Sequence, residues 1–310
     1  MSEILRMRQV TKKFNTQYAL RDVSLTIKKG EVYGLIGRNG AGKTTLLKTI
    51  TRLTIPSNGT VSLFSSQTSG EWTNGLKRTG NVIEMPVAYD QLTAEQNLNY
   101  YCKLRGIVNA KKVVKETLEL VDLADTGKKK FKNFSLGMKQ KLGIAIAILS
   151  KPDFLILDEP INGLDPIAIV EFRRLIRRLN EEYGMTIIIS SHILTELYHV
   201  ATRFGIIHDG ELIQELSKED FDHQSNEYIV LQSSDIEQAS QILNERYGYR
   251  MKVVEEDKLH IFGEANDINP IIKTLVEKQI VVHGIYYSKQ NLEKYFTDLI
   301  SLNQEEVQHA

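Results

Sequence analysis

The residues with the most specific spacing form a glycine-rich segment, Gly37-Arg38-Asn39-Gly40-Ala41-Gly42-Lys43-Thr44. It matches a phosphate-binding loop, in which glycines let consecutive backbone N–H groups approach a phosphate without collision. Lys43 supplies a positive charge for the β- and γ-phosphates, and the Thr44 hydroxyl can ligate Mg²⁺. The segment follows the apolar run Val32–Ile36 and precedes a helical pattern, which is the context such a loop requires. The predicted nucleotide-binding residues here are Gly37, Asn39, Gly40, Ala41, Gly42, Lys43, Thr44 and Thr45.

Two adjacent acids follow a second apolar run, Phe154–Leu157. Asp158 should emerge at the carboxyl end of a central strand, where ligands bind in open α/β sheets, and it suits a magnesium-positioning role. Glu159 could orient and deprotonate an attacking water. Two isolated acids would more simply mark a solvated strand end, but the phosphate loop upstream favours the catalytic interpretation.

Three further residues have the types and positions expected of phosphate ligands. His192 follows the apolar run Ile187–Ile189 and two serines, so it could hydrogen-bond a γ-phosphate and report whether ATP or ADP is present. Ser135 and Gly137 precede the helical pattern Lys139–Leu149, where a hydroxyl, backbone N–H groups and a positive helix end can meet an anion. A structural histidine and a simple N-cap serine are the alternatives.

The elements that must position these residues follow from apolar periodicity. Alternation at Val23, Leu25 and Ile27 predicts a half-buried strand near an antiparallel edge, whereas the continuous runs 154–157 and 186–189 predict strands covered on both faces of a parallel sheet. Asp165-Pro166 predicts the start of a helix that ends near Leu179. Residues 93–132 are mostly helical in pattern, with inward positions at Leu98, Tyr101, Leu104, Val113, Leu118 and Val121. Trp72 is expected to be a packing residue in a loop.

A second domain is expected beyond a boundary near residues 216–226. The pattern there predicts strand 228–232, helix 235–245, strands near 251–254 and 259–262, helix 266–278 and strand 280–286. This order, βαββαβ, is that of the ferredoxin-like arrangement, and a final helix is expected at 290–302.

Composition excludes several classes of protein. The 310 residues carry 39 basic and 39 acidic side chains, so no global field would attract nucleic acid or an anionic membrane surface. The single cysteine, Cys102, excludes an internal disulfide framework and is expected to be a buried thiol. The longest apolar runs, such as Ile144–Leu149, stop at six residues, whereas a membrane span needs about 20. The N-terminus lacks the basic start and apolar core of a secretory signal.

Several segments together resemble the motifs of ATP-binding-cassette (ABC) ATPases. Phe134-Ser135-Leu136-Gly137-Met138-Lys139-Gln140 is similar to their signature segment, Ile161-Asn162-Gly163-Leu164-Asp165-Pro166 to their D-loop, and Ser190-Ser191-His192 to their switch histidine. All occur in the expected order, so the resemblance covers about residues 3–216. Within the family, Ile83-Glu84-Met85-Pro86 and the signature segment look like the variants of bacitracin- and lantibiotic-resistance exporters.

The resemblance implies further site residues, and it also shows positions at which this chain departs from the usual family pattern. Phe14 matches the aromatic residue on which relatives stack adenine, with Tyr18 as an alternative platform. Asp165 belongs to the nucleotide-binding set through the D-loop. Glu84 takes the place of a magnesium-contacting glutamine, and a carboxylate can ligate magnesium too. Leu136 and Met138 replace the usual glycine and glutamine, which raises the question of how efficiently the dimer closes.

The resemblance implies an α/β fold and a role in transport. Residues 1–220 would form the P-loop ATPase core, with a mixed sheet, an antiparallel β edge and a helical subdomain at about 85–135, and residues 221–310 an accessory α+β domain. Two copies, or one copy and a related ATPase subunit, would close on ATP and Mg²⁺ and drive a separately encoded membrane permease from the cytoplasmic face. Export of, or immunity to, a peptide antibiotic is the implied process. A soluble ABC-type switch acting on nucleic acid or the ribosome is the alternative, and a phosphoryl-transferring kinase does not explain Ser135, Gly137 and His192 together.

Overall fold

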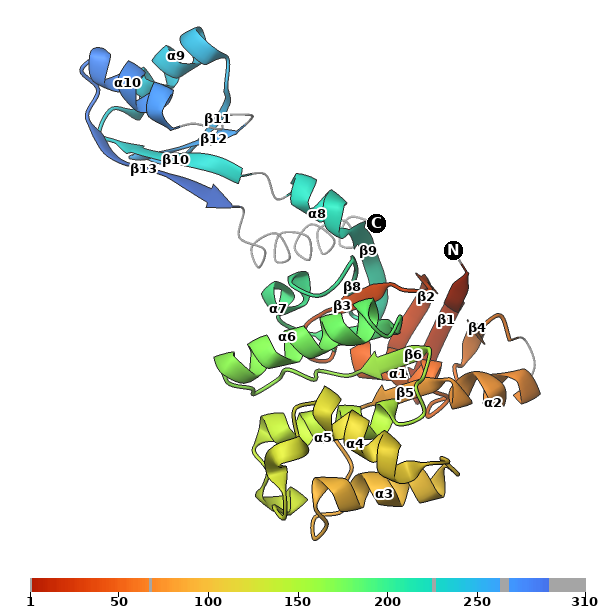
Figure 1. Ribbon diagram of the computed structural model, residues 1–310. Helices are drawn as coiled ribbons and strands as arrows, with labels where there is room; N and C mark the ends of the chain where they lie inside the picture. The colour runs from red at the N-terminus through yellow and green to blue at the C-terminus, as the bar shows by residue number, and fades with distance from the viewer. Residues whose placement is uncertain (1, 67–68, 225–226, 263–267, 290–310) are drawn as a thin grey trace. The chain divides into compact units, whose positions relative to one another are not determined.

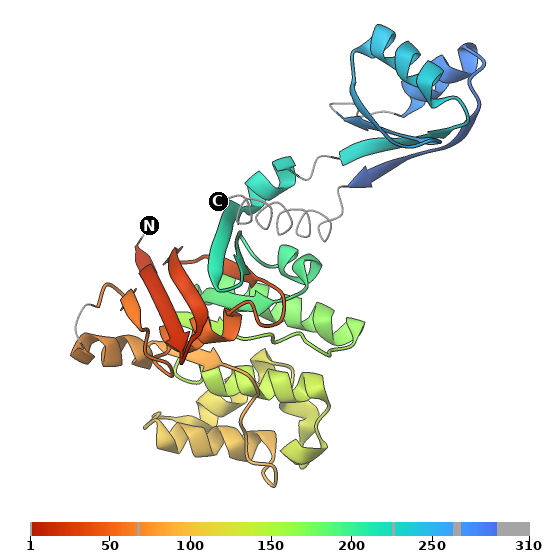
Figure 2. The same cartoon turned by 180° about the vertical axis from the view of Figure 1, so that it is seen from behind.

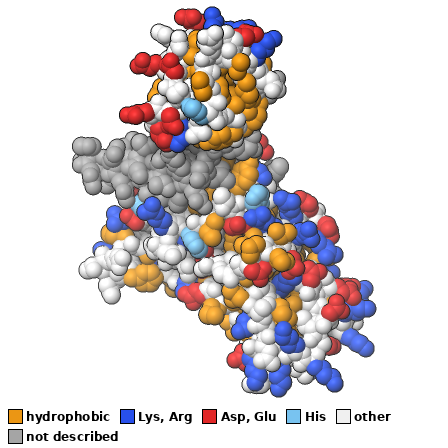
Figure 3. Space-filling model, turned by 90° about the vertical axis from the view of Figure 1, so that its left-hand side faces the viewer, with side chains coloured by type: hydrophobic (Ala, Val, Ile, Leu, Met, Phe, Trp, Pro, Cys, Tyr) orange, Lys and Arg blue, Asp and Glu red, His pale blue; other side chains and the backbone are white. Residues whose placement is uncertain are grey.

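In the computed structural model, which describes residues 2–66, 69–224, 227–262 and 268–289, the chain separates into two units, Met1–Lys218 and Glu219–Ala310. Each unit has its own hydrophobic core. The expected final helix at 290–302 lies outside the described residues. On the face shown in Figure 3, basic and acidic side chains are interspersed over the first unit, in keeping with the balanced composition.

An antiparallel sheet of three strands opens the first unit. Strand β1 (Glu3–Phe14) pairs with β2 (Gln17–Lys28) on one side and with β4 (Asn58–Leu63) on the other, so the order is β2-β1-β4. Val23, Leu25 and Ile27 are buried and their polar neighbours are more exposed, as the alternation predicted. This sheet supplies one wall of the core.

A six-stranded sheet in the order β5-β6-β7-β3-β8-β9 forms the centre of the unit (Figures 1 and 2). Its strands are β5 (Thr79–Val82), β6 (Phe154–Leu157), β7 (Thr186–Ser191), β3 (Val32–Ile36), β8 (Arg203–His208) and β9 (Glu211–Ser217). All neighbours pair in parallel except β8 and β9, which makes the sheet mixed. Every residue of β3, β6 and β7 is buried, because helices or strands cover both faces.

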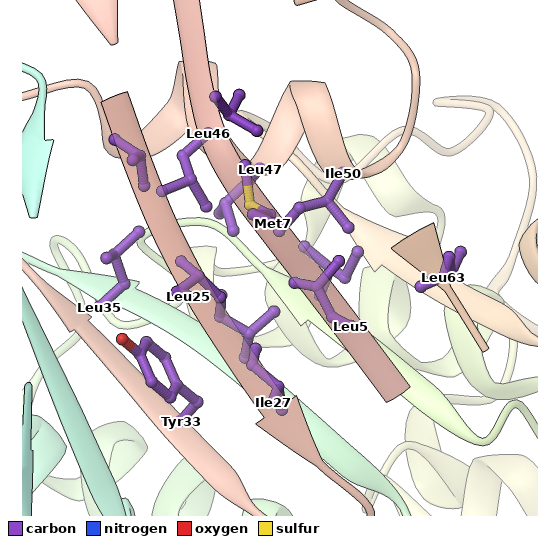
Figure 4. Packing of buried hydrophobic residues seen from close by; sticks show 14 of the residues in the cluster. Leu5, Met7, Leu25, Ile27, Tyr33, Leu35, Leu46, Leu47, Ile50 and Leu63 are labelled. Carbon is purple, nitrogen blue, oxygen red and sulfur yellow. The ribbon is translucent and has the colours of Figure 1, made fainter. Parts of the chain in front are cut away.

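Helix α1 (Lys43–Ile50) packs into the core that joins the two sheets. Figure 4 shows its Leu46, Leu47 and Ile50 among side chains of β1, β2 and β3. These apolar residues recur at helical spacing, so they lie on one face of α1 and fix its position behind the phosphate loop.

Helices α3 (Ala94–Leu104), α4 (Ala110–Leu120) and α5 (Leu136–Ile148) build the expected helical region. They lie together, away from the antiparallel sheet (Figure 1). Thr93 and Gln96 form a capping box at the start of α3, which satisfies free backbone N–H groups there. The prediction that Leu104 faces inward is wrong: 69% of it is exposed, because α3 ends there and its last turn reaches solvent. Cys102 is buried as expected.

The other helices of the first unit are α2 (Ser69–Lys77), α6 (Pro166–Glu181) and α7 (Leu194–Tyr198). Helix α8 (Lys218–Gln224) begins at the unit boundary and belongs almost wholly to the second unit. Two short 3₁₀ turns occupy Ala124–Thr126 and Phe131–Asn133. Trp72 is a packing residue, but it lies on helix α2 and not in a loop. Asp165 caps α6 and Pro166 takes its first position, as predicted.

The second unit contains a four-stranded antiparallel sheet in the order β11-β12-β10-β13. Its elements follow one another as β10 (Glu227–Ser233), α9 (Ile236–Tyr247), β11 (Arg250–Glu255), β12 (Lys258–Phe262), α10 (Asn269–Glu277) and β13 (Val282–Lys289). Leu231, Leu243, Leu259 and Leu275 are among the buried residues that join the two helices to the sheet.

Candidate functional site

The glycine-rich segment forms a tight loop between the end of β3 and the start of α1. Gly42 adopts φ 106°, and a Cβ there would lie 2.6 Å from the carbonyl oxygen of Ala19. A Cβ on Gly37 would lie 2.5 Å from the carbonyl oxygen of Ile207. Both positions therefore require glycine: close packing leaves no room for a side chain at either, and Gly42 also has a left-handed backbone. The loop ends at the N-terminus of α1, where free N–H groups favour an anion.

The side chain of Lys43 folds back over the loop and is held there by backbone carbonyl groups. Its ammonium group donates hydrogen bonds to the carbonyl oxygens of Gly37, at 2.7 Å, and Arg38, at 3.1 Å. The same group lies 3.0 Å from Oε1 of Glu159 in an ion pair, and the lysine side chain is only 6% exposed. A buried ammonium needs such partners, so the loop and Glu159 together fix the cation where phosphate oxygens would lie.

Asp158 and Thr44 meet across the two segments. Asp158 directly follows β6 and is buried, and its Oδ2 accepts a hydrogen bond of 2.8 Å from the Thr44 hydroxyl. Its other oxygen accepts a bond of 2.7 Å from Ser190 at the end of β7. A hydroxyl and a carboxylate side by side are hard oxygen donors of the kind that Mg²⁺ prefers, so this pair fits a magnesium ion bound with a triphosphate.

Glu159 and His192 follow neighbouring parallel strands, β6 and β7. Nδ1 of His192 lies 2.8 Å from Oε2 of Glu159. The backbone N–H of Glu159 donates to the Ser190 hydroxyl at 2.9 Å, and Glu159 adopts φ 46°, a left-handed conformation that is rare for a residue with a side chain. This contact holds the backbone of Glu159 beside the phosphate loop, where a carboxylate can reach a water next to a bound phosphate.

Lys43, Thr44 and Glu159 border a cavity of about 340 Å³, whereas Asp158 and His192 are not among its lining residues. The β1–β2 hairpin also lines this cavity, through Phe14 and Tyr18, which are 49% and 43% exposed. Both aromatic rings can therefore receive a flat base, and both predicted platforms remain available. The predicted residues that line the cavity are Phe14, Asn39, Gly40, Gly42, Lys43, Thr44, Thr45 and Glu159. Ala41 and Gly37 are packed beneath it, since Ala41 is buried and Gly37 closes on Ile207.

The structure does not bring Ser135, Gly137 and Asp165 to this cavity. Ser135 caps α5 by accepting a hydrogen bond of 3.3 Å from the N–H of Met138, and Ser135 itself is exposed. Asp165 caps α6 by accepting from the N–H of Ala168 at 2.9 Å. A Cβ on Gly137 would lie 3.3 Å from that of Ala168, so the signature segment and the D-loop segment form one exposed surface.

Glu84 likewise lies outside the cavity lining and forms an ion pair with Lys48 of α1. Its side chain is 61% exposed and its backbone adopts φ 66°. Lys48 lies one helical turn beyond Thr44, so the carboxylate is held beside the helix that follows the phosphate loop. Its role as a magnesium ligand stays a prediction.

Sequence reasoning missed Gln17 and Ala19, which line the cavity, and it missed the roles of Ser190 and Lys48. Ser190 links Asp158 to the backbone of Glu159, and Lys48 neutralises Glu84. The position of Ser190 at the end of a buried strand was a signal that could have been used. Nothing in the local pattern around Lys48 distinguishes it from an ordinary exposed helix residue.

Comparison with known proteins decides the family. Residues 20–162 match the family model described as "ABC transporter". The chain is 40% identical to the uncharacterized ABC transporter ATP-binding protein YcbN of Bacillus subtilis, with 98% of this chain and 99% of that protein covered. The chain belongs to the family of ABC transporter ATP-binding proteins. As a cassette of this family it binds and hydrolyses ATP.

Two relatives of this ABC cassette have more specific descriptions. It is 38% identical to the bacitracin transport ATP-binding protein BcrA of Enterococcus faecalis, and the match covers 97% of each chain. It is 41% identical to the lantibiotic transport ATP-binding protein SrtF of Streptococcus pyogenes, over 68% of this chain and 90% of that protein. The likeness to bacitracin and lantibiotic transport ATP-binding proteins that the signature and Glu84 segments indicated is therefore confirmed.

Solved structures share the cassette fold. An ATP-binding subunit of an ABC transporter, 32% identical, superposes with a TM-score of 0.62 over 71% of this chain and 92% of that one. An ATP-binding cassette solved as a dimer in a post-hydrolysis state with ADP and phosphate, 26% identical, gives a TM-score of 0.62 over 69% and 99%. Among the described residues of the ABC cassette, no helix is long and apolar enough to cross a membrane.

Proposed function

We propose that this cassette powers a separate membrane permease that exports, or confers immunity to, a peptide antibiotic of the bacitracin or lantibiotic type. The proposed substrate class rests on the likeness to BcrA, which extends over 97% of both chains. The matched region therefore includes the second unit as well as the ATPase core. Relatives that shared only the core would support an ABC ATPase without favouring any cargo.

ATP would bind with its phosphates on the loop 37–44 and its base on Phe14 or Tyr18. Thr44 and Asp158 would hold Mg²⁺, joined by Glu84 when nucleotide draws it from Lys48, and the ion would neutralise charge that develops on the phosphates. Lys43 would exchange its contact with Glu159 for phosphate oxygens. The freed Oε1 of Glu159 could then accept a proton from the water that attacks the γ-phosphate.

His192 would link this chemistry to the presence of the γ-phosphate. Its Nδ1 faces Glu159 at 2.8 Å, which orients the imidazole and leaves Nε2 available to a phosphate oxygen. Loss of the γ-phosphate would remove that partner, so the histidine distinguishes ATP from ADP.

A second cassette would complete the site. Ser135, Gly137 and Asp165 lie on one exposed surface and do not reach the cavity of their own chain. We infer that this surface closes on the γ-phosphate bound by another copy, or by a related subunit, and opens after hydrolysis. The dimeric cassette found among the similar structures supports this arrangement.

The permease would contact the helical region. Met85, Val87 and Leu104 are 73%, 74% and 69% exposed, and they belong to the helix α3 and to the segment that leads from Glu84 into it. We define these three residues as the apolar docking surface. Exposed apolar side chains gathered near a nucleotide-linked segment are typical of a protein interface, and this contact would hold the cassette at the cytoplasmic face of the membrane.

The second unit is proposed to be an accessory domain of the ferredoxin-like type, with the domain boundary near residue 220. Its element order is βαββαβ, and its strand order places β10 and β12 at the centre. Both features agree with the split βαβ arrangement.

The test is recovery of the partner and loss of resistance. Tagged full-length chain, purified from detergent-solubilised membranes of its native cells, should carry a multi-span protein with it. Val87→Asp with Leu104→Asp should lose that protein, whereas Val276→Asp, at an exposed apolar residue of the second unit, should retain it. Cells without the chain should become more sensitive to bacitracin or a lantibiotic. Recovery only with ribosomes, or unchanged sensitivity to every such peptide, would contradict the proposal.

A further inference from the structure

A second and larger cavity lies in the first unit, outside the nucleotide site. Its volume is about 930 Å³, and none of its lining residues lines the nucleotide cavity. Its walls come from the first half of β1, the end of α1 with the segment that follows it, strand β4 with its turn, and α2. Strand β4 is an edge strand of the antiparallel sheet, so the cavity runs beside backbone groups that no neighbouring strand covers.

The charge of this cavity is unbalanced. Arg6, Arg8 and Arg52 line it, against one carboxylate, Glu3, which forms an ion pair with Arg6. Within the part of the chain that the structure describes, Arg8 and Arg52 pair with no carboxylate. The cavity wall therefore carries two guanidinium groups that are not neutralised, and these groups match the geometry of phosphate oxygens.

Trp72 gives an independent indication of a bound group. The side chain lines the cavity and is 2% exposed, yet its indole N–H has no hydrogen-bond partner among the described residues. Buried indole N–H groups usually have a partner. The Arg52 guanidinium lies over the ring, 4.5 Å from its centroid, so an unpaired cation and an unpaired donor occupy the same wall.

Neutral residues complete a mixed lining. Thr60 and Ser65 contribute hydroxyl groups that can donate to an oxyanion, and Ile55, which is 73% exposed, offers an apolar surface at the same cavity. Arg8 lies opposite Thr60 in the β1–β4 pairing, so a guanidinium and a hydroxyl project from the same face of the sheet. This combination suits a ligand with an anionic end and a less polar remainder.

We propose that this cavity is a second binding site, which takes an organic phosphate through Arg8, Arg52 and the hydroxyl groups of β4 and its turn. The site is independent of the ATP site and of the proposed transport role. Two kinds of ligand carry such a phosphate group: a soluble phosphate ester and a lipid with a phosphate headgroup.

Trp72 is the only tryptophan of the chain, so its fluorescence reports on this cavity alone. Full-length protein saturated with ADP should be titrated with inorganic pyrophosphate under selective tryptophan excitation, and with calorimetry as a second measure. A saturable change is expected, and it should persist in Lys43→Ala, which impairs the phosphate loop. Arg8→Gln and Arg52→Gln should each weaken pyrophosphate binding about tenfold, as the loss of a charge-assisted contact predicts.

Lys29→Gln is the matched control, because it removes one positive charge at an exposed residue just after β2 that does not line the cavity. It should bind pyrophosphate like the parent. The Arg8, Arg52 and Lys29 variants should still bind ATP, which shows that they fold. Vesicles that contain phosphatidylglycerol distinguish the two kinds of ligand. A change in tryptophan fluorescence with vesicles that is lost in the arginine variants indicates a lipid headgroup. A fluorescence change with pyrophosphate but not with vesicles indicates a soluble ester. Absence of saturable pyrophosphate binding, or equal affinity in parent and arginine variants, would overturn the proposal.

Discussion

Nδ1 of His192 lies 2.8 Å from Oε2 of Glu159, while the ammonium of Lys43 lies 3.0 Å from the other oxygen of the same carboxylate. Glu159 is thus held between an imidazole that follows β7 and a lysine at the start of α1. Because Lys43 is also the predicted phosphate ligand, nucleotide binding would be coupled to release of the carboxylate through one side chain.

Glu159→Gln should bind ATP and lose about 10²–10⁴-fold in hydrolysis rate, the usual contribution of a general base. The amide keeps the shape of the side chain but cannot take a proton from water. Phosphate release and ATP affinity should both be measured, with Glu182→Gln, at an exposed ion pair of α6, as the control. Turnover close to that of the parent would remove Glu159 from this role.

Ser190→Ala should lower the hydrolysis rate about tenfold and raise the magnesium concentration required. The change removes the donor to Asp158, in a buried hydrogen bond, and the acceptor for the N–H of Glu159, in a partly buried one; each bond contributes about 1 kcal/mol. Activity across a magnesium series checks this, and Ser240→Ala on the exposed face of α9 serves for comparison. An unchanged magnesium response would show that Ser190 does not position Asp158.

Glu84→Gln should make nucleotide affinity depend less on magnesium, because the parent carries an additional negative charge near the triphosphate. Lys48→Met should increase that dependence, since Lys48 neutralises Glu84. The two variants therefore shift the magnesium response in opposite directions. Calorimetric titration with ATP across magnesium concentrations measures both shifts, and identical curves for parent and Glu84→Gln would refute the idea.

Ser135→Ala, introduced into the hydrolysis-deficient Glu159→Gln protein, should weaken ATP-dependent association of two cassettes. Ser135 is exposed at the start of α5 and does not line the nucleotide cavity of its own chain. Sedimentation with ATP and magnesium, and with the permease if required, reports the dimer. Ser150→Ala, an exposed serine just beyond the end of the same helix, should leave the dimer intact. Equal dimerisation of both variants would argue against the proposed interface.

Tyr33 should make the fold sensitive to alkaline pH. Burial raises the pKa of Tyr33 well above its usual value, and so does the nearby Glu215 carboxylate, which accepts a hydrogen bond of 2.8 Å from the Tyr33 hydroxyl. The folded state therefore holds this proton more tightly than the unfolded state, so its stabilisation is present below about pH 10 and is lost as pH rises further. The pH dependence of the free energy of unfolding should be flatter in Tyr33→Phe, and equally steep curves would contradict this account.

The nucleotide site could be predicted from the sequence as a set of local motifs. Gly37–Thr44, Asp158 and Glu159 were predictable because each segment follows an apolar strand pattern, and local chemistry limits what such positions can do. The βαββαβ order of the second unit could also be predicted, since strand and helix periods differ clearly. The exposure of Leu104 and the helix around Trp72 could not, because they depend on where neighbouring elements end.

The tertiary structure alone decided which side chains meet. The parallel pairing of β6 with β7 brings Ser190 to Asp158 and His192 to Glu159, more than 30 residues apart in the chain. The same folding pairs Lys48 with Glu84 and places Arg52 over Trp72, in a cavity that two arginines of β1 also line. Such contacts are set by strand register and helix packing, which depend on the whole core, whereas the motifs themselves depend only on their own few residues.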